Sequence, residues 1–133
     1  MEIHHKIAGL IIKDKKILVT RKYNEPHFII PGGRVEEGES ARETLSRELK
    51  EELSVNLIDM IYWSTHEAVH FKDKNKLILM ESYLAAIEGN PIATSEINEF
   101  IWIDSSYKEK GIKIASIDED YVLPELKKFG LID

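Results

Sequence analysis

Three glutamates occur close together near the middle of this chain, at Glu48, Glu51 and Glu52. On a helix, which turns by about 100° per residue, they fall within roughly 100° of one another and repel each other. A hard divalent cation would offset this repulsion, since Mg²⁺ accepts one or two carboxylates, keeps several waters and completes its shell with substrate phosphate oxygens. The spacing therefore indicates a metal site for phosphate chemistry, although a solvated acidic face is the common alternative in a chain with 24 acidic residues.

The segment that carries these glutamates begins with a helix-start signal. Ser40 and Glu43 match a capping box, in which each side chain bonds the backbone N–H of the other, so the helix is predicted to begin at Ala41. Its apolar stripe consists of Ala41, Leu45, Leu49 and Leu53. Glu48 and Glu52 lie at the edge of this stripe rather than on the solvent side, which favours a site beside the core.

The glutamates belong to a longer spaced pattern. It runs Gly33, five residues, Glu39, seven residues, Arg47-Glu48-Leu49, one residue, Glu51-Glu52, one residue, Ser54-Val55. This pattern resembles the Nudix box, which every position fits except the second glycine, where this chain has Ser54. Six such identities in one register arise by chance in on the order of one window in ten million. Residues 28–33 also resemble the strand and Pro-Gly-Gly turn before the box, and roughly residues 7–103 follow the family's order of elements.

The resemblance implies roles for the acidic residues. Glu48 and Glu52 should be the main ligands of Mg²⁺, or of Mn²⁺ in its place, and Glu51 should add a ligand or act on the attacking water. Such a metal neutralises phosphate oxygens and acidifies a bound water, while a carboxylate accepts the proton during attack on phosphorus. Several family members take that base, or a further ligand, from a loop after the box. Glu96 and Glu99 are the candidates here, with simple surface exposure as the alternative for either.

Three arginine and lysine side chains are candidates for orientation or substrate binding. Arg47 lies outside the acidic face, where it could pair with Glu43 or Glu51 and fix its orientation, or reach a phosphate. Arg21 and Lys22 end the second predicted strand, where Nudix proteins often present basic residues toward substrate phosphates. A basic strand end that faces solvent is the alternative for this pair.

Backbone conformation matters at three positions of the pattern. Gly32 and Gly33 can adopt positive φ and allow the main chain to approach a metal or phosphate closely, or they form merely a tight turn. The glycine that Ser54 replaces suits a left-handed helix end, where a Cβ costs on the order of 1 kcal/mol. We therefore expect intact chemistry and a modestly strained loop after the helix.

The substrate implied by the resemblance is a nucleoside diphosphate derivative, with a simple or oxidised nucleoside triphosphate, split to monophosphate and pyrophosphate, as the first expectation. Other Nudix substrates are ADP-ribose, nucleotide sugars, dinucleoside polyphosphates and capped RNA. No proline occurs between Pro31 and Pro91, although ADP-ribose-type members tend to have one beyond the box, and the tyrosine of dinucleoside polyphosphate hydrolases is missing near Asp73. Residues 118–120, Asp-Glu-Asp, could accept hydrogen bonds from a guanine-like base or simply begin a helix.

Two alternatives lie outside this enzyme class. A catalytically silent Nudix domain that only binds nucleotides or proteins usually loses box glutamates, and this chain keeps all of them. An EF-hand calcium domain is excluded because its Asp-rich loop of twelve residues is absent.

The elements that must position these residues follow from hydrophobic periodicity and turn signals. Strands are predicted at 7–12, 17–20, 27–30, 57–70, 76–87 and 97–103, and a closing helix at 119–129. The first two strands should form a hairpin through 13–16, and Pro31-Gly32-Gly33 should break the third. This order predicts an α+β domain, and the resemblance implies an α/β/α sandwich with a mixed sheet and helices on both faces.

Composition bounds the remaining possibilities. With 133 residues, 43% of them hydrophobic, the chain suffices for one core, so residues 1–133 are predicted to form a single domain. Without cysteine, a metal must be bound by oxygen or imidazole, and a net charge of −6 disfavours a stable nucleic-acid partner. No apolar run or signal peptide indicates a membrane, so we expect a cytoplasmic protein with a nucleotide as its partner, and a homodimer is compatible.

Overall fold

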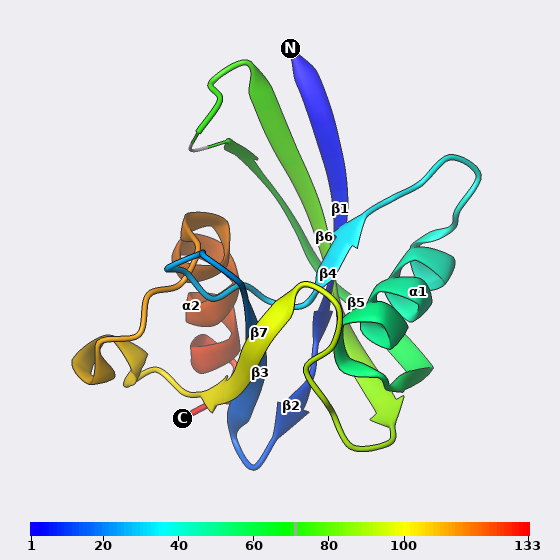
Figure 1. Cartoon of the computed structure of the whole chain (residues 1–133). Coiled ribbons are helices and arrows are strands. Elements are labelled where there is room, and N and C mark those ends of the chain that lie inside the picture. The colour runs from blue at the N-terminus through cyan, green and yellow to red at the C-terminus, as the bar shows by residue number, and fades with distance from the viewer. Residues whose placement is uncertain (71) are drawn as a thin grey trace.

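Two sheets form the centre of the protein in the computed structural model, which describes residues 1–70 and 72–133. One sheet has the strand order β4-β1-β6-β5 and the other β2-β3-β7 (Figure 1). The strands are β1 (Glu2–Leu10), β2 (Ile12–Lys13), β3 (Lys16–Lys22), β4 (Gly32–Arg34), β5 (Asn56–Val69), β6 (Lys76–Glu88) and β7 (Ile97–Ile103). The helices are α1 (Ala41–Leu53), a 3₁₀ turn (Tyr107–Lys110), a π-helical turn (Asp118–Val122) and α2 (Leu123–Lys128).

The larger sheet is mixed, as predicted. β1 runs parallel to β6 and antiparallel to β4, and β5 and β6 form an antiparallel pair. The expected hairpin of residues 7–12 and 17–20 forms only next to its turn, where Ile12 pairs with Ile17. β1 pairs instead with β6, because that partner allows both of its faces to be buried.

The two helices cover opposite faces of the sheets, which confirms the layered α+β fold (Figure 1). Side chains of a strand alternate between faces, so Ile7 packs with Leu45 and Leu49 of α1, while Ala8 belongs to the core that contains Leu126 of α2. Among the described residues, no helix combines the length and the apolar character that a membrane crossing requires.

α1 begins and ends as the sequence predicts. The Glu43 N–H donates to Ser40 Oγ and the Ser40 N–H to Glu43 Oε1, both over 3.1 Å, which completes the capping box. At the other end Ser54 has φ 56° and ψ 36°, and its N–H donates to the Lys50 carbonyl. Ser54 therefore adopts the left-handed conformation that glycine occupies at lower cost.

The segment before α1 differs from the prediction. Residues 27–30 form only isolated bridges, between Ile29 and Thr20 and between Phe28 and Ile114, whereas the predicted break at Gly32 is the start of β4. Gly32 makes this possible through φ 147°, since a Cβ there would lie 2.0 Å from the Ile7 carbonyl oxygen. The glycine thus permits close strand pairing and does not end it.

The closing helix predicted at 119–129 is also reshaped. It starts with the π-helical turn, in which the Leu123 N–H donates to the Asp118 carbonyl five residues earlier. Pro124 has no N–H to continue the ordinary helical bonding, and widening the preceding turn accommodates its ring. This turn places Asp118, which is 1% exposed, inside the protein.

Candidate active site

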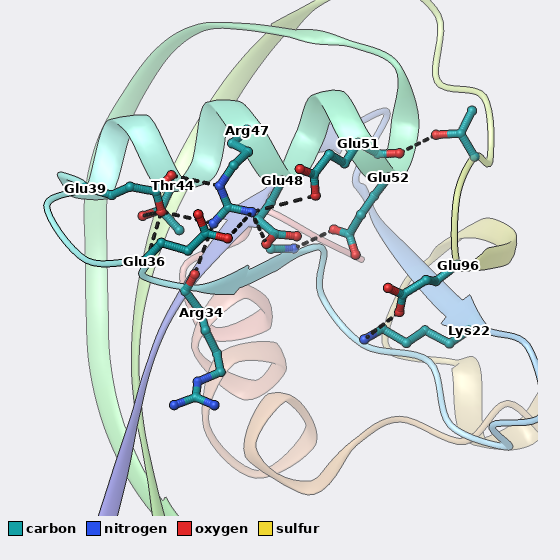
Figure 2. Close-up of polar contacts among 12 residues, drawn as sticks. Lys22, Arg34, Glu36, Glu39, Thr44, Arg47, Glu48, Glu51, Glu52 and Glu96 are labelled. Carbon is teal, nitrogen blue, oxygen red and sulfur yellow. Dashed lines mark hydrogen bonds and ion pairs between the residues drawn. The ribbon is translucent and has the colours of Figure 1, made fainter.

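A cleft of about 560 Å³ lies beside the acidic face of α1. Its wall on the helix consists of Arg47, Glu48, Glu51 and Glu52. Gly32, Gly33 and Arg34 of β4 line it from the sheet, and Lys22 and Glu96 line its rim (Figure 2). The structure therefore brings together most of the residues that the pattern singles out.

Glu52 is the most buried acid of the cleft, with 7% of its surface exposed. Its Oε1 accepts a hydrogen bond of 3.1 Å from the Gly32 N–H. Burial, with a smaller effect from the nearby charge of Glu48, raises the pKa of Glu52 to about 7. A carboxylate in this position is costly to keep charged unless a cation faces it.

Glu48 packs against the backbone of β4. A Cβ on Gly33 would lie 2.3 Å from the Glu48 carboxyl carbon, so only glycine leaves room for this side chain. Contrary to expectation, Gly33 has no positive φ, and its role is this close contact. Burial raises the pKa of Glu48, while the hydrogen bond from Arg47 opposes the rise.

Arg47 joins the acidic residues of the pattern. Its guanidinium donates to Glu39 over 2.7 and 3.0 Å and to Glu48 Oε1 over 2.8 Å, and it also bonds the Arg34 carbonyl over 3.2 Å (Figure 2). The Arg47 bond holds the pKa of Glu39 near 2. Two partners were predicted for Arg47. The Glu51 carboxylate lies 3.6 Å from the Arg47 guanidinium, whereas Glu43 is engaged in the helix cap.

The loop after β6 is fastened to the end of α1. Thr94 donates from its N–H to the Glu52 carbonyl over 3.0 Å and from its hydroxyl to the Glu51 carbonyl over 2.5 Å. These bonds bring Glu96 to the rim, where its carboxylate lies 3.6 Å from the Lys22 ammonium (Figure 2). The Glu51 side chain is more than half exposed and faces the same cleft.

Arg21 and Glu99 lie outside the lining of the cleft. They are opposite each other on β3 and β7 and form an ion pair of 2.9 Å, and Arg21 also bonds the Glu25 carbonyl. Successive side chains of a strand point to opposite faces, so Lys22 enters the cleft and Arg21 does not. Of the candidates Arg21 and Lys22, the cleft lining contains Lys22, and of Glu96 and Glu99 it contains Glu96.

The donor set suits a hard cation that retains waters. Within residues 1–70 and 72–133, no three acidic or histidine side chains form a ready metal cage. Mg²⁺ does not need one, because it binds through one or two carboxylates together with water and phosphate oxygens. Glu48 and Glu52 line the cleft and could provide those carboxylates, and the charge of Glu48 adds to the cost of ionising Glu52.

A second cavity of about 580 Å³ adjoins the cleft. The two share Lys6, Lys22, Ile29, His70 and Ile78. Asp118 lines the second cavity, and its Oδ2 accepts a 3.0 Å hydrogen bond from the Ile30 N–H. Its Oδ1 is buried and has no hydrogen-bond partner among the described residues, and burial raises its pKa.

Lys6 was not among the residues predicted from the sequence, because only strand pairing brings it to these cavities. A signal was present, since Lys6 is a charged residue directly before the apolar run at 7–12. It becomes informative only when β1 is known to lie beside β4 and β6.

Comparison with known proteins agrees with this geometry. The family model of the NUDIX domain matches residues 3–107, so the chain belongs to the Nudix domain family. An "ADP-ribose pyrophosphatase" of Methanocaldococcus jannaschii is 46% identical over 55 residues, which are 38% of this chain and 32% of that protein. A Mycobacterium tuberculosis protein, provisionally named 8-oxo-dGTP diphosphatase 2, is 36% identical over 58 residues, 41% of each chain. The match thus spans well under half the length of these relatives.

The fold is shared with solved structures. A Nudix hydrolase from Nitrosomonas europaea superposes with a TM-score of 0.79 over 98% of this chain and 93% of the other, at 14% identity. At that identity the likeness establishes the fold, and it supports the α/β/α arrangement of helices around a mixed sheet.

Proposed function

We propose that this protein is a Mg²⁺-dependent hydrolase that cleaves a phosphoanhydride bond of a nucleoside diphosphate derivative, first of all a nucleoside triphosphate. The observation that carries the proposal is the gathering of the box acids Glu48, Glu51 and Glu52 on one wall of a cleft. Lys22 lines the same cleft, where its ammonium suits substrate phosphates, whereas the guanidinium of Arg34 points away from the acids toward Glu2 (Figure 2).

Glu48 and Glu52 would hold the cation, for which Mn²⁺ can substitute. When bound, the cation neutralises phosphate oxygens and lowers the pKa of a coordinated water. The burial of Glu52 supports this assignment, because a facing cation restores the charged form that burial disfavours. Arg47 acts as a positioning residue, since its bonds to Glu39 and Glu48 fix the rotamer of the Glu48 carboxylate.

Glu51 is our candidate for the general base. Its side chain is more than half exposed in the cleft and lies 3.6 Å from Arg47, so it can accept the proton of a water that attacks phosphorus. The bond from phosphorus to the bridging oxygen breaks, and pyrophosphate leaves from a triphosphate. Glu96, at the rim beside Lys22, is the second candidate for this base or for a further ligand.

The second cavity supports a nucleoside as the group attached to the phosphates. It opens from the cleft and contains Asp118, whose Oδ1 can accept a hydrogen bond from a base N–H. The relative provisionally named 8-oxo-dGTP diphosphatase is consistent with a guanine-like or oxidised base, whereas the M. jannaschii relative makes ADP-ribose the competing substrate.

A substrate panel tests the proposal. Canonical triphosphates, 8-oxo-dGTP, ADP-ribose, a nucleotide sugar and a dinucleoside polyphosphate would be incubated with Mg²⁺, and the products identified. We expect the highest kcat/KM for a triphosphate, with monophosphate and pyrophosphate as products. A preference for ADP-ribose or a nucleotide sugar would contradict the substrate assignment, and no turnover of any compound would favour the silent binding domain. A cytoplasmic location, a single functional domain over residues 1–133 and a homodimer stay predictions.

A further inference from the structure

Lys6 lies on β1 at the junction of the two cavities and lines both. Along β1, Ile7 packs toward α1 and Ala8 toward α2. Because side chains alternate, Lys6 is on the same face as Ala8, which is the face that carries α2 and the π-helical turn. Lys6 is partly buried, in contrast to the exposed Lys13, Lys15 and Lys16 in and beside the turn after β2.

The ammonium of Lys6 makes no hydrogen bond or ion pair with the described residues, 1–70 and 72–133. Its charge nevertheless acts on two buried carboxylates, Glu52 in the cleft and Asp118 in the second cavity. Lys6 thus lines both the cleft with Glu48 and Glu52, which are assigned to the cation, and the cavity with Asp118, which is assigned to the nucleobase. A nucleotide that extends from the cleft to Asp118 passes this ammonium.

Another cation is better placed for the phosphates. Lys22 also lines both cavities, but its ammonium pairs with Glu96 at the rim of the cleft, beside the loop that follows β6. Lys6, on β1, shares the second cavity with Asp118, whose Oδ1 has no hydrogen-bond partner in residues 1–70 and 72–133. The two groups together offer a charged donor and an acceptor at one site.

We propose that Lys6 is a specificity-determining residue that selects nucleobases with a keto oxygen next to a ring N–H, donating to the oxygen while Asp118 Oδ1 accepts from the N–H. This inference rests on the proposed function, because it assumes a nucleotide in the two cavities. A lysine ammonium has three donors and no acceptor. An exocyclic amino group at the same place therefore leaves the ammonium and the amino group both without an acceptor, and the amino base is disfavoured.

Inosine and adenosine triphosphates provide a clean probe, since their bases differ only in the keto or amino group at C6 and the adjacent ring nitrogen. In the unmodified protein we expect kcat/KM for ITP to exceed that for ATP by at least about tenfold. Lys6→Met, which keeps the chain length and removes the donor, should lower the ITP/ATP ratio about tenfold or more. Lys6→Gln should lower it too, because an amide also offers an acceptor to the adenine amino group.

Two controls distinguish base selection from phosphate binding. Lys22→Met should reduce both rates by a similar factor and leave the ITP/ATP ratio unchanged. Lys13→Met, at the exposed end of β2 and outside the lining of both cavities, should change neither rate. If Lys6→Met lowers ITP and ATP turnover equally while thermal unfolding shows an intact fold, Lys6 binds phosphate and the inference is wrong.

Equilibrium binding separates this inference from the proposed function. IMP and AMP would be titrated into the unmodified protein and into Lys6→Met by calorimetry, without metal. A preference for IMP that disappears in the variant supports the inference even if no triphosphate is hydrolysed, in which case only the proposed activity fails. Equal binding of IMP and AMP by the unmodified protein overturns the inference, whatever the hydrolytic activity.

Discussion

Replacing Glu52 by Gln is expected to raise the stability of the metal-free protein while it removes activity. The amide is isosteric with the protonated carboxyl and keeps an oxygen for the Gly32 N–H. Burial raises the pKa of Glu52 from 4.5 to about 7, so the folded state binds its proton more tightly than the unfolded state does. Folding stability therefore falls as pH rises from about 4.5 to about 7, by about 3 kcal/mol in total.

The assay is urea unfolding at pH 5 and pH 8 in EDTA. At pH 5 the Glu52→Gln and unmodified proteins should have similar free energies of unfolding, and at pH 8 the variant should be more stable by up to about 3 kcal/mol. Glu51→Gln is the matched control, because that side chain is more than half exposed and its replacement should change stability little at either pH.

Metal and turnover complete the test. Mg²⁺ should stabilise the unmodified protein and have a smaller effect on Glu52→Gln, and kcat should fall by orders of magnitude in the variant. The raised pKa of Glu52 is contradicted if the variant is less stable than the unmodified protein at pH 8, or if it loses stability between pH 5 and pH 8 as steeply as the unmodified protein. Near-normal turnover would refute the assignment of Glu52 as a metal ligand.

Three further predictions use the same assays. Gly33→Ala should lower kcat at least about tenfold with the fold intact by circular dichroism, because its Cβ displaces the Glu48 carboxylate; normal kcat would contradict this role. Ser54→Gly should raise the free energy of unfolding by up to about 1 kcal/mol, since residue 54 has positive φ, and a clear loss would contradict the left-handed helix end. Arg47→Met should reduce the free energy of unfolding above about pH 4.5, because the hydrogen bond from Arg47 lowers the pKa of Glu39 to about 2. The difference between the variant and the unmodified protein should vanish as pH falls toward 2 and Glu39 is protonated. A deficit in the variant that persists at pH 2 would point to lost packing instead.

Features that depend on near neighbours in the chain could be derived from the sequence. The capping box, the apolar stripe and the left-handed residue Ser54 all arise within α1 and its ends, and the structure has them as predicted. Because helical geometry fixes the angle between residues three and four apart, the sequence also placed Glu48 and Glu52 on one face beside the core. The order of elements predicted an α+β domain, and the resemblance to the Nudix family implied a mixed sheet with helices on both faces.

Tertiary structure decided which side chains meet across the sheets. Strand pairing decides that Gly33 contacts Glu48, that Lys22 rather than Arg21 lines the cleft, and that Lys6 lines the same cavity as Asp118. The Ile30 N–H that holds Asp118 is 88 residues away in the chain. Local periodicity carries no information about such pairs, because strand order and register depend on burying both faces of β1 at once. The wide turn before Pro124, which places Asp118 inside the protein, was likewise not indicated by any local pattern.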